Sequence, residues 1–132
     1  MERESTNLKR SDLVYPELSY RLVGIFYNIH NQLGGGLKEK HYQNAIAEEL
    51  SKNDIKFTKE FPVTIPFKNK EIGKYFLDFL IEDKIVLEIK IKHFKKEFFD
   101  QLLGYLKQTD LKLGIIAIFG KDKLTFKRII NL

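Results

Sequence analysis

Apolar residues recur every three to four positions in three segments of the chain, which predicts three amphipathic helices. The segments cover residues 16–33, 38–53 and 97–108. The triplet Gly34-Gly35-Gly36 separates the first two helices, because glycine enters positive φ at little cost and so allows a tight reversal of the chain.

Shorter apolar segments with β-branched and aromatic residues predict five strands. They cover residues 57–67, 72–81, 85–92, 113–119 and 124–130. Pro62 and Pro66 indicate that the first is an edge strand, since proline cannot donate to a sheet ladder. The continuous apolar run 113–119 is typical of a strand buried on both faces. The predicted order α-α-β-β-β-α-β-β is an α/β fold with a mixed sheet flanked by helices.

At 132 residues the chain is long enough for one domain, predicted over residues 14–132, after a charged flexible tail at 1–13. The tail has no apolar signal-like region, and the longest apolar stretch, 115–119, is far too short to cross a bilayer. These features predict a cytoplasmic protein without a membrane partner. The absence of cysteine excludes zinc ribbons and thiol catalysis, so a metal site would use mostly oxygen ligands. A net charge of +5 suits a polyanionic partner.

The candidate chemistry lies in the segment 85–92, where the odd positions are all apolar. Glu88 and Lys90 therefore point together to the opposite face. Asp78 lies on the preceding predicted strand, in an otherwise apolar stretch. If three residues, 82–84, form the turn, Asp78 lies directly opposite Glu88; a two-residue turn would move Asp78 to the other face.

Two neighbouring carboxylates and a lysine can hold a hard divalent cation and assist phosphodiester hydrolysis. The alternative is ordinary: Glu88 and Lys90 form a solvated ion pair of little energetic value. Asp78 favours the first interpretation, because a carboxylate in an apolar segment needs a partner or a metal.

Asp78, followed after nine residues by Glu88-Ile-Lys90, resembles the PD-(D/E)xK nuclease signature. Residues 36–42 match the GxxExxY motif of a small family in that superfamily. Further segments similar to that family are residues 30–34, 100–105 and 111–120, so that the resemblance covers about 14–130.

The resemblance implies a restriction-endonuclease-like core and a role for each matching residue. Asp78 and Glu88 would be metal ligands, helped by Glu39 at the start of the second helix, and the metal would be Mg²⁺ or Mn²⁺. Lys90 would be the catalytic lysine, and Gln101 an auxiliary polar residue near the scissile phosphate. Tyr42, the last residue of the motif, could contact the site or serve as a core aromatic.

A basic cluster beside the predicted site comprises Lys92, His93, Lys95 and Lys96, which we expect to contact a nucleic-acid backbone. The leading hypothesis is therefore a divalent-metal-dependent nuclease acting on DNA. A non-catalytic module that binds nucleic acid or a protein partner is the alternative, and a purely structural protein is a third. A homodimer would suit cleavage of two strands.

Overall fold

The computed structural model describes residues 14–132; the tail predicted at residues 1–13 lies outside this range. The helices and strands, in chain order, are α2 Pro16–Leu33, α3 Glu39–Lys52, β1 Phe57–Phe67, β2 Lys70–Ile81, β3 Ile85–Ile91, α4 Lys96–Thr109, β4 Leu113–Phe119 and β5 Leu124–Ile130. The predicted order of helices and strands is confirmed, and the predicted α/β class with it.

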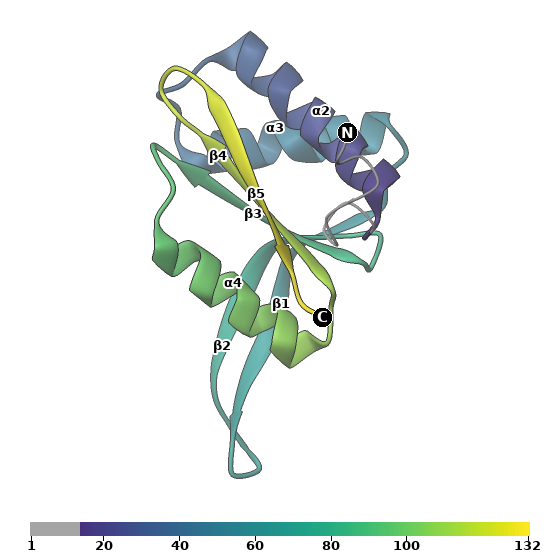
Figure 1. The fold of residues 1–132 in the computed structure, drawn as a ribbon, viewed down its shortest axis with the longest axis vertical. Coiled ribbons are helices and arrows are strands. Elements are labelled where there is room, and N and C mark those ends of the chain that lie inside the picture. The colour runs from purple at the N-terminus through teal and green to yellow at the C-terminus, as the bar shows by residue number, and fades with distance from the viewer. Residues whose placement is uncertain (1–13) are drawn as a thin grey trace, which may run out of the picture.

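The five strands form one mixed sheet in the order β1-β2-β3-β4-β5. Only β3 and β4 run parallel, and α4 connects them. Helices α2 and α3 lie on one face of the sheet and α4 on the other, while the β1–β2 hairpin extends beyond the layers (Figure 1). Strand β1, which carries Pro62 and Pro66, is at the edge as predicted.

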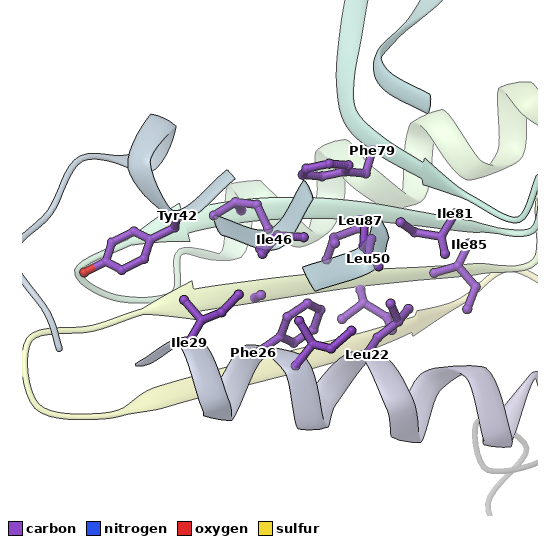
Figure 2. Close-up of a cluster of buried hydrophobic side chains, with 14 of the residues drawn as sticks. Leu22, Phe26, Ile29, Tyr42, Ile46, Leu50, Phe79, Ile81, Ile85 and Leu87 are labelled. Carbon is purple, nitrogen blue, oxygen red and sulfur yellow. The ribbon is translucent and has the colours of Figure 1, made fainter. Parts of the chain in front are cut away.

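The larger core fills the space between α2, α3 and the sheet (Figure 2). Leu22 and Phe26 of α2 and Ile46 of α3 pack there against Leu87 of β3, and all four side chains are fully buried. Every residue of β4 is buried, which confirms the predicted double-sided burial of that strand.

A second core lies beneath α4, where Leu102 and Leu106 pack against Ile116 and Ile118 of β4. The helix comes close to the strand at Gly114, where an added Cβ would lie 2.8 Å from a methyl carbon of Leu102. Helix α4 begins at Lys96, shortly after β3 ends at Ile91, so its first turn lies near the carboxyl end of β3.

The turn between β2 and β3 sets the register that the candidate site requires. Ile81 pairs with Ile85, so residues 82–84 form the turn, as expected for the three-residue alternative. Glu82 and Asp83 adopt left-handed conformations with φ of 52° and 57°. The register places Asp78 and Glu88 at facing positions, directly beyond the last regular pair, Phe79 and Leu87.

Candidate active site

At Asp78, the β1–β2 hairpin changes which of its faces packs against each of the two cores. Phe79 belongs to the core under α2 and α3, whereas Leu77, two residues earlier, belongs to the core under α4. Residues two apart in a regular strand share a face, so the strand is irregular between them. On β1, Glu60 lies opposite Asp78, has a φ of 52° and forms no regular pair with β2. Here β2 separates from β3.

Where β2 and β3 separate, hydrogen bonds to side chains replace the regular backbone hydrogen bonds between the two strands. The backbone N–H of Asp78 donates to Oε2 of Glu88 at 2.8 Å, and the backbone N–H of Ile89 donates to Oδ2 of Asp78 at 2.7 Å. Each carboxylate is thus held by the strand that carries the other. The two predicted metal ligands lie together because these reciprocal bonds fix them.

Burial and mutual repulsion disfavour the ionised form of both Asp78 and Glu88. Glu88 is only 5% exposed, and burial, with the nearby charge of Asp78, raises its pKa to about 7. Burial also raises the pKa of Asp78, and the charge of Glu39 adds to this effect. The Ile89 N–H, Lys90 and the Gln43 side chain oppose the rise. Such a site gains stability when a positive charge enters it.

Lys90 supplies one positive charge from β3. Its Nζ lies 4.7 Å from the centroid of the Phe98 ring, on the first turns of α4, which is a cation–π arrangement. The charge of Lys90 lowers the pKa of both Asp78 and Glu88. Phe98 therefore limits where the ammonium group can lie relative to the carboxylates.

Tyr75 is part of this site, although the sequence interpretation missed it. Its hydroxyl donates to Oε1 of Glu88 at 3.0 Å, and its ring stacks on Tyr105 of α4 with the centroids 4.1 Å apart. Burial, followed by the charge of Glu88, raises the pKa of the Tyr75 hydroxyl. Simple alternation gives no signal for this contact, because an odd position on β2 is expected to face away from Glu88. The face change at Asp78 brings Tyr75 to the same side.

The other predicted residues differ in how they relate to the Asp78–Glu88 pair. Glu39, half-buried in the first turn of α3, acts on Asp78 through its charge. Gln101 is exposed on α4, and within residues 14–132 no hydrogen bond joins it to Asp78 or Glu88. Tyr42 is fully buried, donates to the Gly34 carbonyl at 2.7 Å and stacks on Phe119, so it is a core aromatic.

The donor set suits a hard cation with few protein ligands. In the part of the chain that the structure describes, no three His, Cys, Asp or Glu side chains are grouped closely enough to hold a metal ion. Mg²⁺ commonly uses one or two carboxylates and keeps several waters. The Asp78–Glu88 pair therefore fits Mg²⁺ or Mn²⁺ in number and chemistry, and Glu39 lies near enough to influence it electrostatically.

A basic cavity of about 570 Å³ opens beyond the end of β3. Lys92, His93 and Lys121 line it, together with the glycines before α3. Two members of the predicted basic cluster thus share one cavity. The other two lie at the start of α4, where Lys95 approaches the Phe98 ring and Lys96 pairs with Asp100 at 3.0 Å.

Comparison with known proteins shows the superfamily of the chain. A family model described as the PD-(D/E)XK nuclease superfamily matches residues 16–129, which include both carboxylates and Lys90. The chain belongs to the PD-(D/E)XK nuclease superfamily. Members of this superfamily act on nucleic acid and generally use divalent metals.

A solved structure shares the fold of this PD-(D/E)XK protein. The crystal structure of SSO0001 superposes with a TM-score of 0.56 and 22% identity, over 70% of this chain and 50% of that chain. The match thus spans about half the length of SSO0001, and it supports the fold alone. No curated protein matches the chain. Among residues 14–132, no helix is long and apolar enough to span a membrane.

Proposed function

We propose that the protein is a divalent-metal-dependent nuclease that hydrolyses phosphodiester bonds in DNA, and that it belongs to the GxxExxY family. The observation that supports this most directly is the reciprocal bonding of Asp78 and Glu88, with Lys90 two residues along β3. A cytoplasmic location and a homodimer that cuts two strands are part of the same proposal.

The proposed roles follow from the charges at the site. Asp78 and Glu88 would hold Mg²⁺ or Mn²⁺, and Glu39 would act as a third carboxylate through its charge near Asp78. When bound, the cation supplies positive charge against the phosphoryl oxygens and lowers the pKa of a water. The Lys90 ammonium group orients the attacking water and neutralises charge on the phosphoryl group in the transition state. Gln101 contributes a polar contact once the substrate is present.

The nucleic-acid backbone would follow the basic cluster next to the site. Lys92 and His93 line the cavity beyond β3, and Lys95 and Lys96 lie at the start of α4. Phosphate contacts of this kind position a strand without reading its sequence. This arrangement supports a nuclease that recognises backbone and shape.

Cleavage assays test the proposal directly. Single-stranded DNA, duplex DNA and RNA would each be incubated with the protein in Mg²⁺, Mn²⁺ or EDTA. We expect metal-dependent cleavage of DNA that Asp78→Asn and Lys90→Met each reduce about 100-fold or more. The matched controls are Asp83→Asn in the exposed β2–β3 turn and Lys52→Met in the exposed last turn of α3. Cleavage that survives both site variants would refute the mechanism, and cleavage of RNA alone would refute the substrate.

A non-catalytic binding module is the second candidate, and one observation favours it. Both oxygens of Glu88 already accept hydrogen bonds, from Tyr75 and from the Asp78 backbone. Calorimetric titration with Mn²⁺ separates the two candidates. The nuclease requires heat of binding that Asp78→Asn removes, whereas the module requires nucleic-acid binding with no metal uptake.

A further inference from the structure

The outer half of the β1–β2 hairpin carries large apolar side chains that the rest of residues 14–132 leaves more than half exposed. Phe67 is 56% exposed, Ile72 is 64% exposed and Phe76 is 54% exposed. The hairpin projects away from the helices and from the rest of the sheet (Figure 1). Exposed apolar groups gathered in this way mark an interaction surface more often than scattered single residues do.

Two of these side chains, Ile72 and Phe76, lie on β2 within a few residues of Asp78. Lys74 and Phe76 alternate with Tyr75 along β2, so they share one side of the hairpin, and Ile72 lies two residues before Lys74, at a shift in the β1–β2 register. The intervening Tyr75 and Leu77 pack toward α4 instead. We define the outer face as Ile72, Lys74 and Phe76, together with Pro62 and Thr64, which pair across from Phe76 and Lys74. Asp78 follows two residues after Phe76, where β2 becomes irregular and separates from β3.

The charge of the hairpin favours a polyanion. Lys68, Lys70 and Lys74 are all exposed, and Glu71 is the only acidic residue between Phe67 and Phe76. The Nζ of Lys68 lies 5.3 Å from the centroid of the Phe67 ring, so cation and aromatic group already adjoin at the tip. Proteins that bind unpaired strands combine these features, because bases stack on apolar rings while lysines contact phosphates.

The edge of the hairpin is unsuited to a second copy of this chain. At the hairpin, a second copy could add a strand to β1, one of the two edge strands of the sheet. Pro62 and Pro66 lack the N–H groups that such pairing needs. The outer face, with Lys74 on it and further lysines at the tip, is the exposed part of the hairpin that can receive a partner.

We propose that the outer face of the β1–β2 hairpin docks an unpaired segment of the DNA substrate and guides it to Asp78. Phe76 and Ile72 receive bases, and Lys74 and the lysines at the tip contact phosphates. The DNA identity of the strand rests on the proposed function. The surface itself rests on exposure, alternation and charge. A nuclease with this surface prefers DNA that has unpaired bases, such as a single strand, a flap or an open junction.

Binding without cleavage tests the surface. Fluorescence anisotropy would follow a labelled single-stranded oligonucleotide and a blunt duplex of the same sequence, both in EDTA. We expect the wild-type protein to bind the single strand more tightly, and Phe76→Ala with Ile72→Ala to weaken that binding about tenfold. Duplex binding should change less than twofold. Tyr20→Ala is the matched control, because Tyr20 is 82% exposed on α2. Helix α2 lies far from the hairpin tip (Figure 1).

Each contrary result overturns the proposal in a different way. Equal losses of affinity for the single strand and the duplex would show that unpaired bases are not recognised. No loss of affinity would show that the surface does not bind DNA. If sedimentation shows that the double variant dissociates a dimer, the surface belongs to a second copy. These failures are separate from failure of the nuclease itself, which would appear as absent cleavage in Mg²⁺ or Mn²⁺ while binding in EDTA is retained.

Discussion

Two parts of one sheet differ sharply in how they use their apolar residues. Strands β3 and β4 pair in parallel through seven positions, and helices cover both of their faces. The outer hairpin of β1 and β2 keeps one face against the α4 side and leaves Ile72 and Phe76 exposed. Asp78 lies at the junction between this outer hairpin and the inner strands. The comparison suggests that the inner strands provide stability, whereas the outer hairpin is available for binding.

The largest expected difference between the two parts is in unfolding free energy. Leu87→Ala removes a fully buried side chain from β3 and should cost about 2–5 kcal/mol. Ile72→Ala on the outer hairpin should change stability by about 0.5 kcal/mol or less. Urea unfolding of both variants measures the difference. Similar costs would mean that the hairpin is as important for stability as the inner strands.

The next effect concerns Glu88 at the junction. Its pKa is raised from 4.5 to about 7, so the folded metal-free protein keeps a proton that the unfolded chain has released. Stability should therefore fall as pH rises from 4.5 to 7, by roughly 3 kcal/mol at 1.36 kcal/mol per unit, and then level off. Asp78, whose pKa is also raised, acts in the same direction.

Glu88→Gln isolates this contribution, because glutamine resembles the protonated acid. We expect the variant to match the wild type near pH 4 and to be more stable at pH 8, as measured by unfolding without metal. Mg²⁺ or Mn²⁺ should reduce the difference in free energy of unfolding at pH 8, because the ion stabilises the wild type alone. A wild-type advantage that grows with pH in EDTA would contradict the raised pKa.

A smaller effect is expected for Tyr75, which connects the hairpin to Glu88. Tyr75→Phe removes the hydroxyl that donates to Glu88, at a cost of about 1 kcal/mol. That bond lowers the pKa of Glu88, so its loss should raise the pKa further and move the pH–rate profile of cleavage to higher pH. Tyr105→Phe keeps the ring stack and the Tyr75–Glu88 bond, and should leave the profile in place. A shift of equal size in both variants would show that the hydroxyl of Tyr75 has no special role.

The smallest effect is expected on the α4 side of the junction. Phe98→Leu removes the aromatic face beneath Lys90, an interaction worth about 0.5–1 kcal/mol, so single-turnover cleavage should slow a few-fold. Phe99→Leu, in the same core and on the same helix, is the matched control. If both variants cleave at the same rate, packing alone positions Lys90.

Much of the fold could be predicted from local patterns. The double-sided burial of β4 follows from its unbroken apolar run, and the edge position of β1 follows from Pro62 and Pro66. The Ile81–Ile85 pairing was one of two open registers, since either turn length fits the same residues. Tyr75 could not be predicted, because the face change that brings it to Glu88 depends on the irregular backbone at Glu60 and Asp78.

Local sequence patterns specify the helices and strands, their order, and which carboxylates and lysine are available for chemistry. Periodicity and turn residues are local properties, so neighbouring residues suffice to specify them. The folded chain sets how Asp78 and Glu88 hold one another, and which aromatic rings adjoin them. Those contacts depend on register, twist and the packing of α4, where residues distant in the chain must fit together in space.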